Sequence, residues 1–185
     1  MYSKDALTEI VRECALEFGE FTLASGKKAS YYLDCRKVTL DSRGAQLIAR
    51  GILELLGDTL PDAVGGMAIG ADPISAAVIT EAASQDKQLR AFIVRKEAKE
   101  HGKGNQVEGP VTAGDQVVIV EDVVTTGGSS LKAIEHVEAA GLTVLGVIAI
   151  IDRMEGGREN FESAGYQLQT LLTIEDFGIA PPASE

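Results

Sequence analysis

The feature that most constrains this chain is the alternation, after Pro61, of short apolar runs with helical periodicity. Residues 116–120 and 142–151 are almost continuously apolar, and each run ends at polar or charged residues. Strands that are apolar on both faces are typical of a parallel sheet that helices cover on both sides. The pattern therefore predicts an α/β fold, with a doubly wound, mostly parallel sheet flanked by helices.

The remaining elements of this core follow from the same periodicities. Asp72 and Pro73 indicate the N-cap and the first position of a helix. The other expected strands cover 63–69, 90–95 and 167–172, and the expected helices cover 72–84, 127–140 and 155–164.

The N-terminal third has a different pattern. The elements expected there are a helix over 6–18 capped by Ser3, strand-like runs over 21–23 and 31–35, and a helix from Asp41 to Gly57. The whole chain has 185 residues, the length of one domain. We therefore expect a single domain over 1–185, in which residues 1–60 form a small hood and flap beside a core of residues 61–185.

Charge and composition exclude several classes of partner. Asp and Glu total 28 against 17 Lys and Arg, a formal net charge of −11. Nucleic acids and anionic membranes are bound through excess positive charge, so we expect neither. The run 144–151 is far shorter than the roughly 20 residues that cross a bilayer. The N-terminus is unlike a signal peptide, and Cys14 and Cys35 lack CxxC spacing, so a cytoplasmic protein is expected.

The most informative segment runs from Val117 to Ser130 and reads VVIVEDVVTTGGSS. It predicts a strand, a turn of small and hydroxyl residues over 125–129, and then a helix. Backbone N–H groups at a helix N-terminus form a phosphate site, at the sheet edge where open α/β folds bind ligands. Glu121 and Asp122 would repel a phosphate but would accept hydrogen bonds from ribose hydroxyls. The segment therefore predicts a site for a phosphorylated sugar.

Two other phosphate-binding motifs contain glycine-rich turns, and the sequence matches neither. Residues 65–70 have the glycine spacing of a P-loop, but Ala71 and Asp72 follow in place of the required Lys-Ser/Thr pair. The dinucleotide pattern Gly-x-Gly-x-x-Gly does not occur. An ordinary strand–turn–helix corner with exposed acids remains the alternative to a sugar-phosphate site.

A basic island lies between Arg95 and Lys103, where four basic residues stand against two acidic ones. Residues 97–115 lack apolar periodicity, which predicts a mobile loop over 97–110. Long loops in compact domains often serve as active-site lids. Such a loop suits an anion whose charge grows as a bond breaks, and the alternative is a solvated loop of mixed charge.

The segment 117–130 resembles the phosphoribosyl-pyrophosphate motif of the type I phosphoribosyltransferases. Within that superfamily the chain resembles the orotate phosphoribosyltransferase family, through the stretches FTLASGKKASYYLD, RKEAKEHGKGNQVEG and IDRMEGG. The resemblance implies transfer of the phosphoribosyl group of 5-phosphoribosyl 1-diphosphate (PRPP) to orotate. The products would be orotidine 5′-phosphate and pyrophosphate, as in pyrimidine biosynthesis, with Mg²⁺ as cofactor.

The resemblance also implies roles for individual residues. The PRPP contacts it implies are Arg95, Lys96, Lys99, His101, Glu121, Asp122, Val123, Val124, Thr125, Thr126, Gly127, Gly128 and Ser129. Lys99 and Asp122 are the expected catalytic residues, with Asp122 a candidate proton acceptor. Thr125 and Arg153 are the expected orotate contacts. Lys96 matches a lysine that reaches the neighbouring subunit's site, which implies a homodimer. No metal-binding cluster of the protein is expected, because Mg²⁺ would bridge substrate oxygens.

The sequence is compatible with several alternatives. Arg153 suits a planar carboxylate through two parallel hydrogen bonds, or it forms a salt bridge with Asp152 or Glu155. Ala24 stands where many members of the family carry a lysine, and Gly70–Ala71 stand near the position of a lysine in some members. A purine or uracil acceptor is a second enzymatic interpretation, against which Arg153 argues. A nucleotide-sensing regulator that binds nucleic acid is a third, against which the acidic charge argues.

Overall fold

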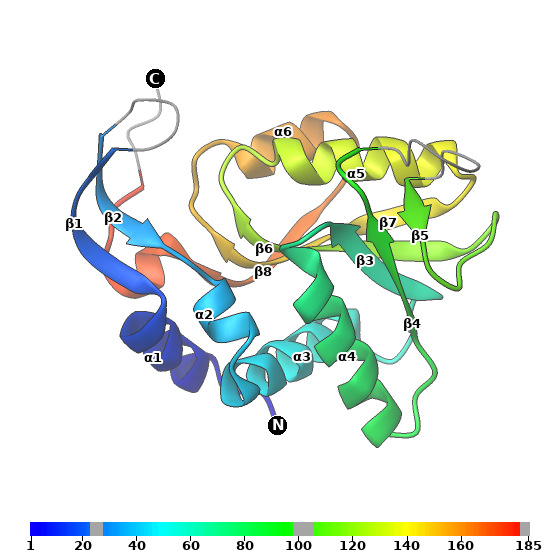
Figure 1. Ribbon diagram of the computed structural model, residues 1–185, viewed down its shortest axis with the longest axis horizontal. Coiled ribbons are helices and arrows are strands. Elements are labelled where there is room, and N and C mark those ends of the chain that lie inside the picture. The colour runs from blue at the N-terminus through cyan, green and yellow to red at the C-terminus, as the bar shows by residue number, and fades with distance from the viewer. Residues whose placement is uncertain (23–27, 98–105, 182–185) are drawn as a thin grey trace.

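The computed structural model describes residues 1–22, 28–97 and 106–181. Its centre is a six-stranded sheet of order β5-β4-β3-β6-β7-β8, beside a two-stranded sheet of β1 and β2 (Figure 1). Neighbours in the large sheet run parallel, except for the antiparallel pair β4 and β5. The predicted doubly wound, mostly parallel α/β fold is thereby confirmed, with an N-terminal antiparallel hairpin at its side.

The bounds of the elements are as follows. The strands are β1 Leu16–Thr22, β2 Lys28–Leu33, β3 Ala63–Met67, β4 Arg90–Val94, β5 Val107–Glu108, β6 Gln116–Val124, β7 Thr143–Asp152 and β8 Leu168–Thr173. The helices are α1 Lys4–Cys14, α2 Arg36–Thr39, α3 Ser42–Leu56, α4 Ala71–Ser84, α5 Gly128–Ala139 and α6 Gly157–Ser163, followed by a 3-10 turn at Ile174–Phe177.

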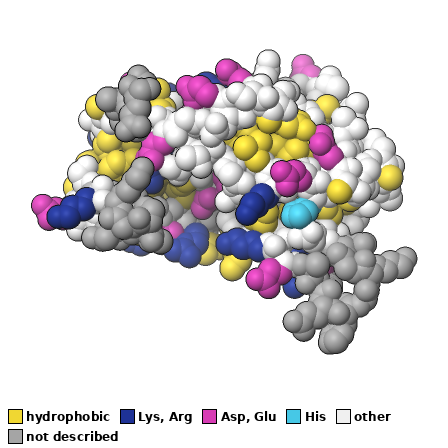
Figure 2. Space-filling model, turned by 90° about the horizontal axis from the view of Figure 1, so that it is seen from above, with side chains coloured by type: hydrophobic (Ala, Val, Ile, Leu, Met, Phe, Trp, Pro, Cys, Tyr) yellow, Lys and Arg dark blue, Asp and Glu magenta, His cyan; other side chains and the backbone are white. Residues whose placement is uncertain are grey.

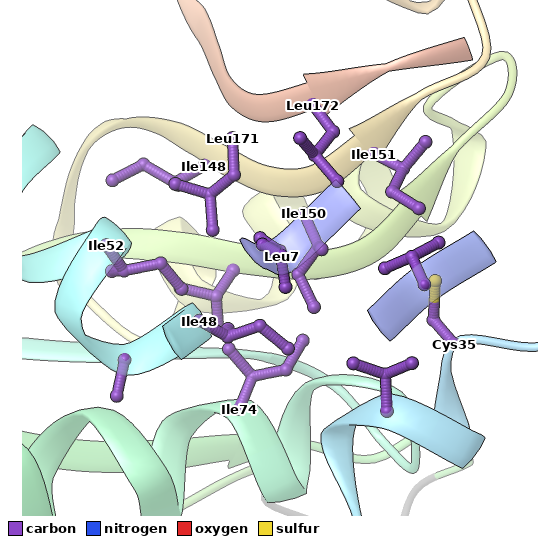
Figure 3. Packing of buried hydrophobic residues seen from close by; sticks show 14 of the residues in the cluster. Leu7, Cys35, Ile48, Ile52, Ile74, Ile148, Ile150, Ile151, Leu171 and Leu172 are labelled. Atoms are coloured by element: carbon purple, nitrogen blue, oxygen red, sulfur yellow. The ribbon is translucent and has the colours of Figure 1, made fainter. Parts of the chain in front are cut away.

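The large sheet separates two apolar clusters. Helices α1, α3 and α4 cover one face, and α5 and α6 cover the other (Figure 1). Because side chains alternate along a strand, Val118 and Val120 of β6 join the first cluster, whereas Val117 and Ile119 join the second. Figure 3 shows the first cluster, in which three helices meet strands β7 and β8 through Leu7, Ile48, Ile52, Ile74, Ile148, Ile150, Leu171 and Leu172.

Two helix caps lie where the sequence predicted them, and two other predicted helix ends were wrong. Ser3 and Asp41 cap α1 and α3, as predicted. The helix expected over 6–18 was wrong at its end, because α1 stops at Cys14 and the hairpin strand β1 follows. Asp72 is not an N-cap, since α4 begins one residue earlier and Gly70 precedes it.

The order of the strands fixes where a ligand can bind. From β3 the chain moves outward to β4 and then returns to the other side of β3 as β6. The carboxyl ends of β3 and β6 therefore form a topological switch point, the usual place for a ligand in an open α/β sheet. The loops over 68–70 and 125–127 follow these two strands.

No helix of the described ranges is long and apolar enough to cross a bilayer.

Candidate functional site

A cavity of about 750 Å³ lies at this switch point. Its walls come mainly from three segments: residues 32–36 at the end of the hairpin, residues 67–70 after β3, and residues 121–130. Of the segment that was predicted to bind a phosphorylated sugar, residues 121–130 line the cavity, whereas residues 117–120 are buried in the core. Strand β6 extends to Val124, so the acidic pair lies within the strand rather than after it.

The turn between β6 and α5 is built to expose backbone. Gly127 precedes α5 with a φ of 79°, and no side chain caps that helix. The first N–H groups of a helix have no partner within it, so those of α5 remain available to an anion. A Cβ on Gly127 would lie 2.8 Å from the Phe161 ring, and the Asn160 side-chain amide donates to the Thr126 carbonyl at 2.9 Å. Helix α6 therefore supports the turn from behind.

Glu121 is a buried carboxyl group in the cavity wall, with 8% of its surface exposed. The Ser130 hydroxyl donates to Glu121 Oε2 at 2.7 Å. The pKa of Glu121 is raised from 4.5 to about 7, mainly by burial; the Ser130 hydrogen bond lowers it and the neighbouring Asp122 carboxylate raises it, and both effects are included in that value. Near neutral pH this group therefore exchanges a proton, and it can accept from or donate to a hydroxyl.

Asp122 is half-buried and also faces the cavity. Its Oδ1 accepts a hydrogen bond from its neighbour Val123 N at 2.9 Å. The loop after β3 comes close to it, because a Cβ added to Gly70 would lie 3.1 Å from Asp122 Oδ1. The carboxylate is thus placed between the two loops of the switch point.

The expected basic contacts are distributed unevenly. Lys96 lines the cavity, whereas Arg95 is exposed and its Nη1 pairs with Glu108 Oε1 at 3.4 Å. Lys99 and His101 lie outside the described residues. On the face that Figure 2 shows, Lys and Arg side chains lie among Asp and Glu rather than in one continuous basic surface.

Two further cationic side chains line the cavity, Arg36 and Lys132, and neither was predicted from the sequence. Arg36 Nε and Nη2 donate to the two carboxylate oxygens of Asp34 at 2.8 and 3.0 Å. Arg36 begins α2, a helix too short to produce an apolar period in the sequence. The cluster of charged residues in YYLDCRK was the available signal, but its place beside the cavity depends on the tertiary fold.

Arg153 lies beside the cavity rather than in its lining. Its backbone N–H donates to the Val124 carbonyl at 2.9 Å, which fixes it next to the end of β6. The alternative salt bridge is present, because Arg153 Nη2 lies 2.7 Å from Glu155 Oε1. Asp152 pairs instead with Arg158, at 3.5 Å.

The chain is similar to proteins of known family. Residues 39–176 match the family model described as phosphoribosyl transferase domain. The chain is 60% identical over 173 residues to the orotate phosphoribosyltransferase of Rhodopirellula baltica, with 90% of each chain covered. This chain belongs to the orotate phosphoribosyltransferase family. As a member of that family, it is a phosphoribosyltransferase.

Solved structures of the family have the same fold. The chain is similar to Mycobacterium tuberculosis H37Rv orotate phosphoribosyltransferase in complex with Fe(III) dicitrate, with a TM-score of 0.84, 37% identity, and coverage of 95% of this chain and 99% of that one. It is also similar to the same enzyme in complex with PRPP, with a TM-score of 0.81, 35% identity and the same coverage.

Proposed function

We infer that this protein transfers the phosphoribosyl group of PRPP to orotate and forms orotidine 5′-phosphate and pyrophosphate. One observation carries the inference. A helix N-terminus without a side-chain cap and two adjacent carboxyl groups, Glu121 and Asp122, line the same cavity at the switch point. A phosphorylated sugar needs both kinds of group at this spacing.

The turn and the acidic pair bind different parts of PRPP. The backbone N–H groups of residues 125–129 hold the 5-phosphate, and Val123 and Val124 form the wall between turn and acids. Glu121 and Asp122 hold the ribose hydroxyls. Catalysis then rests on position and electrostatics, because the anomeric carbon gains positive charge as pyrophosphate leaves. Asp122 is the proposed acceptor for the proton that orotate loses.

The pyrophosphate side is assigned to the basic residues. Lys96, Arg95, Lys99 and His101 offset the negative charge that grows on the leaving group. Mg²⁺ suits this face, because Glu121 and Asp122 supply hard carboxylate oxygens near the ribose. These two carboxyl groups would hold the ion, and when bound it would neutralise part of the charge on the leaving group.

The acceptor side is assigned to Arg153 and Thr125. Thr125 lines the cavity, and Arg153 stands at its edge beside Val124. A guanidinium offers two parallel N–H groups to a planar carboxylate, which orotate has and uracil and the purines lack.

The direct experiment is an assay of the purified protein with PRPP, Mg²⁺ and each of orotate, uracil, adenine and hypoxanthine. Orotidine 5′-phosphate should form with orotate alone, and its formation should stop when a chelator removes Mg²⁺. No product with both substrates at saturation would overturn the proposal, as would faster turnover of another base.

The domain, the oligomeric state and the cellular location are also proposals. We propose that residues 1–185 form one domain and that the hairpin serves as its hood. We propose a homodimer to which Lys96 contributes across the interface, on the resemblance alone. Free thiols at Cys14 and Cys35 are compatible with the reducing cytoplasm, where we place the protein.

A further inference from the structure

Two side chains contact the Arg153 guanidinium, Tyr31 and Glu155. Arg153 Nε donates to the Tyr31 hydroxyl at 2.9 Å, and the guanidinium carbon lies 4.9 Å from the centre of the Tyr31 ring. Glu155 holds the other end of the same edge through Nη2. Only 16% of the arginine side chain is exposed. The guanidinium is thus fixed by three contacts before any ligand arrives.

These contacts join two parts of the chain that lie 122 residues apart. Tyr31 belongs to β2 of the N-terminal hairpin, and Arg153 directly follows β7 of the large sheet. The next residue of the hairpin, Tyr32, lines the cavity. The hairpin therefore contributes one tyrosine to the cavity wall and the other to the arginine at its edge.

The Arg153 guanidinium has more N–H donors than its contacts with Tyr31 and Glu155 use. Arginine has five N–H donors in a planar fork. Tyr31 and Glu155 engage Nε and Nη2, and within residues 1–22, 28–97 and 106–181 no side chain or carbonyl accepts a hydrogen bond from Nη1. The outer edge of the fork, Nη1 with the second Nη2 hydrogen, can therefore bind a carboxylate through two parallel bonds. A side chain fixed in advance loses less entropy when the ligand binds.

We propose that Tyr31 is a positioning residue, which holds Arg153 for the carboxylate of the acceptor base and so contributes to the selection of a carboxylated pyrimidine. The proposal rests on the proposed function, because it takes Arg153 as the contact to orotate. Tyr31 acts through the arginine and does not touch the reacting atoms. Burial raises the pKa of Tyr31 above its ordinary value, so its hydroxyl stays neutral and the contact persists at working pH.

The test is Tyr31→Phe, which keeps the ring and removes the hydroxyl. We expect KM for orotate to rise about tenfold, the effect of losing one hydrogen bond to a charged group, while kcat and KM for PRPP stay unchanged. Tyr166→Phe is the matched control. That tyrosine is also half-buried, and its hydroxyl donates to a carboxylate, Glu138, away from the cavity. The control should leave both KM values unchanged.

A second arm separates an indirect effect from a direct one. In an Arg153→Ala background, Tyr31→Phe should cause no further loss of kcat/KM for orotate, because the residue it positions is gone. A full tenfold loss in that background would overturn the proposal, since Tyr31 would then act on the substrate itself. Equal changes in both KM values, or no change, would also overturn it and leave Tyr31 as a support of the hairpin. Failure of the proposed function would be distinguished by the wild-type protein, which would then make no orotidine 5′-phosphate.

Discussion

The two sides of the cavity are constructed in different ways. The proposed phosphate side is one continuous segment of the lining, residues 121–130, which presents backbone N–H groups and two carboxyl groups. The proposed base side lies at the edge of the cavity and joins side chains from distant segments, Tyr31 of the hairpin and Arg153 with Glu155 after β7. The first side depends on the path of the backbone and the second on how a separate hairpin packs against the core.

The two constructions imply different kinds of specificity for the donor and the acceptor. A backbone turn that binds the 5-phosphate and two carboxyl groups that bind the hydroxyls would accept any phosphorylated ribose, because all such donors share these groups. A side-chain contact that depends on tertiary packing can change without altering the donor site. Changes on the phosphate side should therefore alter KM for PRPP, and changes on the base side should alter KM for orotate.

The largest effect is expected from Gly127→Ala. The substitution combines a φ of 79° with a Cβ only 2.8 Å from the Phe161 ring, so the turn must move. We expect kcat/KM for PRPP to fall about a hundredfold and the free energy of unfolding to fall by about 3 kcal/mol. Steady-state kinetics and urea unfolding measure both.

Gly165→Ala is the matched control for that substitution. Gly165 has a φ of 89°, but nothing lies within 4 Å of its added Cβ. It should lose about 1 kcal/mol through backbone conformation alone and keep its activity. A Gly127→Ala protein with the wild-type KM for PRPP would show that the turn does not hold the phosphate.

Glu121→Gln should gain stability and lose activity. The folded protein binds an extra proton between pH 4.5 and about 7, so stability falls as pH rises through this range. The raised pKa corresponds to about 3 kcal/mol, and the variant should exceed the wild type by that amount in urea unfolding at pH 8 but not at pH 4. Glu159→Gln, an exposed change in α6, should show no such difference. Equal stability of Glu121→Gln and wild type at pH 8 would contradict burial as the cause.

Ser130→Ala should have a smaller effect on the same carboxyl group. Removal of the hydroxyl leaves Glu121 without its donor, and we expect KM for PRPP to rise about tenfold while KM for orotate stays constant. Ser75→Ala is the matched control, because Ser75 is equally buried but donates to a backbone carbonyl of α4. The interpretation fails if both variants behave alike.

Asn160→Ala should have the smallest effect. Its amide donates to the Thr126 carbonyl from an exposed position, so water can replace part of the bond. We expect kcat/KM for PRPP to fall about threefold, in line with roughly 0.6 kcal/mol for such a bond. A lower kcat/KM for orotate, measured at saturating PRPP, would contradict the assignment of Asn160 to the phosphate side.

The sequence predicted the phosphate side because that side is contiguous. Apolar strand, acidic pair, small-residue turn and helix follow one another within 117–130, so their spacing alone brings them together. The parallel sheet was also predictable from contiguous residues, because runs such as 142–151 are apolar on both faces. The roles of Lys99 and His101 stay predictions, since these residues lie outside the described ranges.

The base side was only partly predictable. Arg153 was expected at a strand end, but its contact with Tyr31 depends on how the hairpin folds back against the sheet. The burial of Glu121 was also missed, because strand β6 extends past the apolar run and carries the carboxyl group into the wall. Short elements such as α2 and β5 contain too few residues to show a period.

The decisive measurement is a crystal structure of this protein with PRPP. We expect the 5-phosphate oxygens to accept hydrogen bonds from backbone N–H groups of residues 125–129. We also expect the ribose hydroxyls to lie within hydrogen-bond distance of Glu121 and Asp122. A 5-phosphate bound elsewhere, with the turn at the start of α5 unoccupied, would contradict it.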